Sequence, residues 1–103
     1  MDVLLAALAE PARWRLVCLL AVRPQSVGIL AQLSGAHQPQ TTKHLQTLER
    51  ADVVRSHRSG QRRMYTLRAE RLRDLAAALH GLAEAADLAS GPSSSENTAT
   101  PGL

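Results

Sequence analysis

Apolar residues recur along the first part of the chain at the three- and four-residue spacing of helices. Residues 3–8 predict a short apolar helix that ends before Glu10-Pro11, because a residue that precedes proline avoids helical backbone angles. Pro11 suits the first turn of a second helix, and Arg23-Pro24 ends it. The predicted apolar band of this second helix comprises Trp14, Leu16, Val17, Leu19 and Leu20.

The next two predicted helices are short and are separated by a glycine. Ser26 is a good N-cap for a helix that runs to about Ser34, with Ile29, Leu30 and Leu33 as its expected buried face. Gly35 supplies the turn. A fourth helix over 38–50 carries Thr41, Leu45 and Leu48 as an inner stripe. The side chains left facing outward are polar: Gln38, Gln40, Thr42, Lys43, Gln46 and Thr47.

The pattern then changes to strands and returns to helix. Val53-Val54 and Met64–Leu67 predict two short strands, joined by a basic loop whose expected tip is Ser59-Gly60. From Ala69 to about Ala89 the spacing predicts a long helix with a coiled-coil seam. The seam is formed by Leu72, Leu75, Leu79, Leu82, Ala86 and Ala89. Residues 90–103 are rich in Ser, Thr, Gly and Pro, and we expect a disordered tail after one domain over 1–89.

The charge distribution points toward a polyanionic partner. The net charge is only +3, but no acid occurs over 11–48 or 53–69, and the second of these segments holds five arginines. A solvated basic face is the alternative interpretation. No apolar run is long enough to span a membrane, and the N-terminal segment lacks the positive charge that precedes a signal core, so we expect a cytoplasmic protein.

Two short helices joined by a glycine-containing turn are typical of the helix-turn-helix, whose second helix enters the major groove. Gln40 and Thr42 can donate to and accept from base edges, and Lys43 can donate to guanine or to phosphate. A polar solvent-facing side is the alternative for this helix alone. The basic hairpin that follows favours DNA binding, because its arginines can hold phosphates or the minor groove.

The residues themselves resemble the ArsR family of winged helix-turn-helix repressors. The resemblance is carried by LAEPARWRLVCLL, SVGILAQLSG, HQPQTTKHLQTLERADVV and RSGQRRMYTL, which run from about Leu5 to Leu67. It implies a mainly α fold with a small β-hairpin wing, dimeric through its terminal helices. It also implies a regulator, of repressor type, that binds a palindromic operator as a homodimer, with 38–50 in the major groove and the 55–63 wing on the backbone or minor groove. The expected DNA contacts are Gln38, Gln40, Thr41, Thr42, Lys43, His44, Arg58, Gln61, Arg62 and Arg63.

Three positions depart from the family pattern or leave alternatives open. His37 replaces the usual Ser cap, and Ile29 replaces the acid that would complete a capping box with Ser26, so both helix starts should be weaker. His44 lies at a position near the groove, but a half-buried histidine that is hydrogen-bonded within the domain is the favoured interpretation.

We predict no metal site and no cofactor, and any inducer is unknown. The thiolate site that the resemblance implies would fall on Ser26-Val27-Gly28, and the site across the last helices on Ala69, Arg71, Leu82 and Ala85, none of which is a ligand. His80 and Glu84 are one turn apart, yet two ligands are too few for zinc, so a solvent-facing pair is expected. Cys18, the single cysteine, is expected to be a buried or partly buried inert thiol, although two copies in a dimer could pair.

A dimer is expected because one helix in one groove contacts too few bases to select a site in a genome. The proposed interface residues are Val3, Leu4, Leu8, Leu72, Leu75, Leu79, Leu82 and Ala86; alternatively these faces cover the monomer's own core. The rival function is a winged-helix adaptor for protein binding, but the 38–50 helix presents no aromatic or apolar anchors. An enzyme is disfavoured, because the histidines and Cys18 show no partner pattern.

Overall fold

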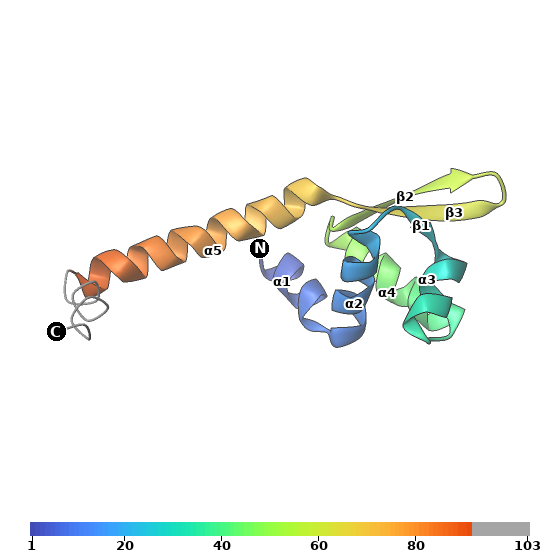
Figure 1. Ribbon diagram of the computed structural model, residues 1–103, viewed down its shortest axis with the longest axis horizontal. Helices are drawn as coiled ribbons and strands as arrows, with labels where there is room; N and C mark the ends of the chain where they lie inside the picture. The colour runs from blue at the N-terminus through green and yellow to red at the C-terminus, as the bar shows by residue number, and fades with distance from the viewer. Residues whose placement is uncertain (92–103) are drawn as a thin grey trace. The chain divides into compact units, whose positions relative to one another are not determined.

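The computed structural model describes residues 1–91, and the chain divides into two units, Met1–Leu72 and Arg73–Leu103. The first unit contains four helices, α1 (Asp2–Ala9), α2 (Pro11–Leu20), α3 (Val27–Ser34) and α4 (Gln38–Arg50). A three-stranded antiparallel sheet of order β1-β3-β2 completes it, formed by β1 (Gln25–Ser26), β2 (Val54–Ser59) and β3 (Arg62–Leu67). In Figure 1 the β2–β3 hairpin extends from the helices, which confirms the predicted mainly α architecture with a β wing.

The helix ends follow the capping residues that the sequence offers. The Glu10 carboxylate accepts from the Ala12 amide ahead of α2, and the Ser26 hydroxyl accepts from the Ile29 amide at 3.3 Å. Gly35 ends α3 at a φ of 72°, a left-handed conformation that glycine adopts without strain. His37 forms no side-chain cap on α4, as predicted from its replacement of serine.

The core of the first unit lies between the helices and the inner face of the sheet. Thr41, Leu45 and Leu48 are buried, which confirms the predicted inner stripe of α4. Burial of the whole Leu45 or Leu48 side chain contributes about 1.5–3 kcal/mol to folding. The largest fully buried apolar side chains are Leu4, Leu16, Leu30, Leu45, Leu48, Val53 and Val54.

Several predicted core positions are wrong. Trp14 is 52% exposed, and Ile29 and Leu33 are 43% and 48% exposed. Helix α3 has only eight residues, and it packs through Leu30 and Ala31, so its apolar pattern is wider than the face it buries. Cys18 is exposed, contrary to the expected buried thiol.

Two residues that we assigned to a dimer surface lie in the core instead. Leu4 is fully buried and Leu8 is 8% exposed, because the N-terminal helix uses them to cover its own domain. Val3, at 64% exposed, remains on the outer face of α1.

The hairpin is longer than predicted, and its turn lies one residue later. Ser59 pairs with Arg62, so Gly60 and Gln61 form the tip, and Gly60 has a φ of 64°. Strand β1 was not predicted. It has two residues and pairs Gln25 with Tyr65 and Ser26 with Met64.

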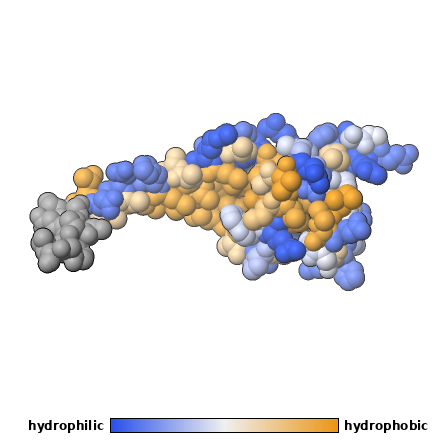
Figure 2. All heavy atoms as spheres, in the orientation of Figure 1, coloured by the Kyte–Doolittle hydropathy of each residue, from blue (hydrophilic) through white to orange (hydrophobic). Residues whose placement is uncertain are grey.

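Helix α5 (Ala69–Ser90) begins in the first unit and forms the described part of the second. None of its residues is buried, and Figure 2 shows apolar residues along much of its visible face. The predicted tail begins at Ser90, which ends α5, and 92–103 lie outside the described residues. Within residues 1–91 no helix has the length and hydropathy needed to cross a membrane.

Candidate nucleic-acid interface

Helices α3 and α4 form a helix-turn-helix. The amides of Gly35 and Ala36 donate to the carbonyls of Gln32 and Ala31, which closes the end of α3 and turns the chain toward α4. The buried stripe of Thr41, Leu45 and Leu48 then fixes the rotation of α4 about its axis. Its polar side therefore faces away from the core.

The outer side of α4 has a crest and two flanks, because helix residues three or four apart share a face. Lys43 and Gln46 lie on the crest and are exposed. Gln38 and Thr42 share one flank, and Gln40 and His44 share the other; the glutamines are exposed, whereas Thr42 and His44 are half-buried. These six side chains form the polar row of α4. They contain amide, hydroxyl, ammonium and imidazole groups, which suit hydrogen bonding to base edges and phosphates.

Thr41 cannot contribute to this outer surface, contrary to our expectation. The side chain is 1% exposed, and its Oγ1 donates to the His37 carbonyl at 3.0 Å. This bond adds to the one from the Thr41 amide to the same carbonyl. Thr41 therefore holds the first turn of α4 from inside.

His44 is held from inside the domain by a residue that we did not predict. Arg13 Nη1 lies 3.5 Å from His44 Nδ1, while Arg13 Nε donates to the Ala7 carbonyl at 2.6 Å and Nη2 donates to the Ala6 carbonyl at 3.1 Å. This contact agrees with the favoured interpretation of His44 as a half-buried, internally bonded histidine. No sequence signal marks it, because residues 13 and 44 lie far apart in the chain.

The wing arginines point to different faces of the hairpin. Arg58 pairs directly with Arg63, so their side chains share one face, whereas Arg62 pairs with Ser59 and lies on the other. Arg63 Nη1 donates to Ser56 Oγ at 3.0 Å, and Ser56 Oγ donates to Glu49 Oε2 at 2.7 Å. Arg63 is thus tied to α4, while within residues 1–91 neither Arg58 nor Arg62 forms an ion pair.

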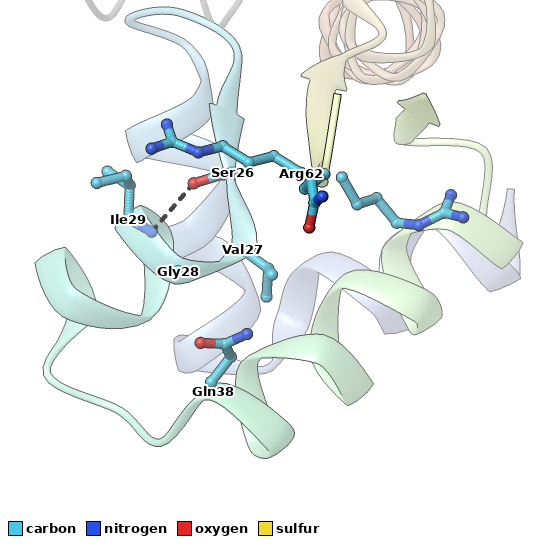
Figure 3. A pocket seen from close by; sticks show the side chains of 8 residues that line it. Ser26, Val27, Gly28, Ile29, Gln38 and Arg62 are labelled. Atoms are coloured by element: carbon cyan, nitrogen blue, oxygen red, sulfur yellow. Dashed lines mark hydrogen bonds between the residues drawn. The ribbon is translucent and has the colours of Figure 1, made fainter. Parts of the chain in front are cut away.

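The wing and the start of α4 border the same surface hollow, which has a volume of about 310 Å³ (Figure 3). Gln38 of α4, Gln61 of the turn and Arg62 of β3 line it together with the start of α3. With Arg63, four of the predicted DNA contacts, from two separate elements and the turn between strands, therefore lie around one depression.

Burial and neighbouring charges shift the pKa values of Tyr65 and Glu70, which lie beside the wing. Burial, and then the charge of Glu49, raise the pKa of Tyr65, and Arg63 opposes that rise. Arg68 donates to Asp52 and to Glu70, and the bond from Arg68 holds the pKa of the Glu70 carboxyl below its usual value. The ion pair between Arg68 and Asp52 lies at the turn from α4 into β2, where Asp52 has a φ of 66°.

Metal ligands do not gather in the described part of the chain. Among residues 1–91 no group of three or more His, Cys, Asp and Glu side chains is placed to hold an ion. His80 Nε2 lies 3.2 Å from Glu84 Oε1, and both side chains are well exposed, which confirms the predicted solvent-facing pair.

No protein-family model matches the chain, and no curated protein sequence matches it. Solved structures do match. An ArsR-like transcriptional regulator from Rhodococcus sp. RHA1 is 26% identical with a TM-score of 0.79, and the match covers 89% of each chain.

Two further structures extend this likeness. The transcriptional repressor BigR from Xylella fastidiosa is 32% identical, with 79% of this chain and 83% of that one covered and a TM-score of 0.65. The homodimeric winged helix-turn-helix DNA-binding domain of Mb0332 from Mycobacterium bovis is 26% identical, with 81% and 77% covered and a TM-score of 0.68. With this identity, coverage and helix-turn-helix followed by a wing, the chain belongs to the ArsR family of winged helix-turn-helix transcriptional regulators.

Proposed function

We propose that this chain binds duplex DNA sequence-specifically as a homodimer and represses transcription by covering a promoter. Helix α4 lies in the major groove of each half-site, and the wing contacts the adjacent backbone or minor groove. The observation that carries the proposal is the polar row of α4, placed beside a wing whose Arg58 and Arg62 have no acidic partner in residues 1–91.

The polar row of α4 and the wing have different roles in DNA recognition. Gln38, Gln40, Thr42 and Lys43 read base edges, because amides and hydroxyls match the donor and acceptor pattern of the major groove. Arg58, Gln61 and Arg62 hold the backbone, where contacts fix the register without reading sequence. Arg63 supports the wing through Ser56 and Glu49.

Dimerisation belongs to the same proposal. Two copies of α4 about 34 Å apart reach two half-sites of a palindrome, which a single helix cannot do. The seam of Leu72, Leu75, Leu79, Leu82 and Ala86 on α5, with Val3 of α1, supplies apolar surface for a second copy. The homodimeric state of the Mycobacterium bovis domain supports this arrangement.

Repression is supported by two observations. BigR, 32% identical, is a transcriptional repressor. Every helix and strand of residues 1–91 belongs to the winged helix or to α5, and the action on a promoter that these elements support is to occupy it.

The test is a binding series with duplex DNA that contains the region upstream of the protein's own gene, beside a random duplex of equal length. We expect tighter binding to the upstream duplex, and an affinity that falls linearly with the logarithm of salt concentration, because each neutralised phosphate releases counterions. A flat salt response with equal weak binding would support the protein-binding adaptor instead. Repeating the series with zinc, arsenite or an oxidant identifies any inducer.

A further inference from the structure

We infer that His44 donates its Nε2 hydrogen to a DNA phosphate, and that Arg13 is the positioning residue that fixes the ring for this contact. The inference rests on the proposed function, because it adds a contact and its support to the same DNA surface. It joins the two interpretations of His44, since one ring nitrogen bonds within the domain and the other faces the nucleic acid.

The first step is the anchoring of the Arg13 guanidinium. Arg13 lies in the first turn of α2, half-buried, and donates through Nε and Nη2 to the carbonyls of Ala7 and Ala6. These carbonyls belong to the last turn of α1, where no amide of the same helix remains to bond them. Two bonds to backbone atoms therefore hold the planar guanidinium in one orientation.

The second step identifies the tautomer of the neutral imidazole. The remaining contact of Arg13 is from Nη1 to His44 Nδ1, at 3.5 Å. A guanidinium has only donors and does not lose its proton, so Nδ1 must be the acceptor. A neutral histidine that accepts at Nδ1 carries its hydrogen on Nε2. Arg13 thus leaves His44 with one free group, and that group is a donor.

The third step is the location of this donor. His44 shares a flank of α4 with Gln40, and together with His37, Pro39 and Lys43 they line a hollow of about 470 Å³ on the surface. The other flank faces the wing through Gln38. His44 therefore lies at the margin of the recognition helix that is next to α2, not on its crest.

A phosphate is the acceptor that fits this margin. The margin lies off the crest of α4 that enters the groove, so the DNA group nearest to it is the sugar-phosphate backbone that borders the groove. Phosphate oxygens accept and never donate, which matches a lone N–H, and the ammonium of neighbouring Lys43 adds charge attraction. The contact then sets the depth and register of α4 without reading a base.

Two variants of His44 test the roles of its two ring nitrogens separately. The amide oxygen of H44N can occupy the place of Nδ1 and keep the bond to Arg13, but H44N has no donor at the Nε2 position. The amide nitrogen of H44Q reaches the Nε2 position and loses the acceptor for Arg13. We expect H44N to bind about three- to tenfold more weakly to both the upstream and the random duplex, as for loss of one hydrogen bond, with H44Q closer to wild type.

The role of Arg13 is tested without DNA. Nitrogen-15 NMR of the full chain should show His44 protonated on Nε2 in the wild type and a mixture of tautomers in R13M, which keeps an unbranched chain but removes the donors. A purely structural role of Arg13 would lower stability without changing that signature. Circular dichroism of each variant confirms folding.

Three results would overturn the inference. If H44N binds DNA with wild-type affinity, His44 does not donate to a phosphate. If H44N loses affinity only for the upstream duplex, His44 contacts a base and not a phosphate. A hydrogen on Nδ1 in the wild type refutes positioning by Arg13. Failure of the wild type to bind either duplex is a different outcome, because it removes the proposed function itself.

Discussion

Arg58 and Arg63 lie directly opposite each other on β2 and β3, so two positive side chains project from one face of the wing. Like charges at directly opposed positions destabilise a strand pair. Arg63 donates to Ser56, which holds it toward α4, and both arginines are exposed. An anion that binds between them would relieve the repulsion, so the pair favours the complex over the free protein.

Replacing Arg58 by alanine should therefore have opposite effects on folding and binding. We expect the free energy of unfolding to rise by about 0.2–0.5 kcal/mol as repulsion is removed. Affinity should fall similarly for upstream and random duplexes, and the salt slope should drop by about one. Denaturant unfolding and a salt series measure these quantities. R73A, an exposed arginine of α5, is the matched control, and a loss limited to the upstream duplex would contradict backbone contact.

Gln40 and Thr42 should determine base preference. Truncation of either to alanine should weaken binding to the upstream duplex by about 1–3 kcal/mol and leave the random duplex almost unchanged, because only base-edge contacts are lost. Competition binding with both duplexes gives the ratio. Q32A, an exposed glutamine on α3, is the control. Equal losses on the two duplexes would show that these side chains contact phosphate.

Leu45 and Thr41 test the inner side of α4. Leu45 is fully buried, and L45A should destabilise the domain by about 2–5 kcal/mol, through lost burial and the cavity that remains. T41V should cost less than about 1.5 kcal/mol, because the His37 carbonyl keeps its bond from the Thr41 amide. Urea unfolding compares them. Folded T41V should prefer the upstream duplex over the random duplex as strongly as the wild type does. A changed preference would show that Thr41 contacts DNA after all.

Arg68 should control the titration of Glu70. The folded pKa of Glu70 is lowered by Arg68, so the stability it contributes is present above the unfolded pKa and is lost as pH falls through the folded value. In R68Q the pKa of Glu70 should rise toward that of a free glutamate. Carbon-13 NMR titration of the carboxyl measures it, with R73Q as control. An unchanged pKa in R68Q would mean that the ion pair does not form in solution.

Acidic substitutions on the α5 seam should dissociate the proposed dimer. Leu79 and Leu82 are 54% and 69% exposed, and L79E/L82E should give a monomer in analytical ultracentrifugation, with upstream DNA bound more weakly. L88E, also exposed but outside the seam spacing, should remain dimeric. Dimers of both variants would place the interface elsewhere.

The sequence predicted features that depend on local pattern. The stripe of Thr41, Leu45 and Leu48 was recognised because α4 is long enough for its spacing to be regular, and the Ser26 cap and the Gly35 turn are chemical preferences of single residues. Ile29 and Leu33 were misassigned because two turns of helix do not define which apolar side faces inward.

Features that depend on distant parts of the chain escaped prediction. Strand β1 exists only because β3 lies beside Gln25 and Ser26, and two residues carry no strand pattern of their own. The contact of Arg13 with His44 joins α2 to α4, and the opposite faces of Arg62 and Arg63 follow from a strand register that the loop length alone did not fix.

The absence of buried residues in α5 has a consequence for gene control in the proposed homodimer. In that dimer a helix with no buried residue in the single chain would gain stability from a second copy, so the amount of competent regulator would depend on the square of the protein concentration at low abundance. Promoter occupancy would then rise more steeply than synthesis. A modest drop in expression, or dilution at cell division, would release the gene more sharply than loss of a monomeric regulator.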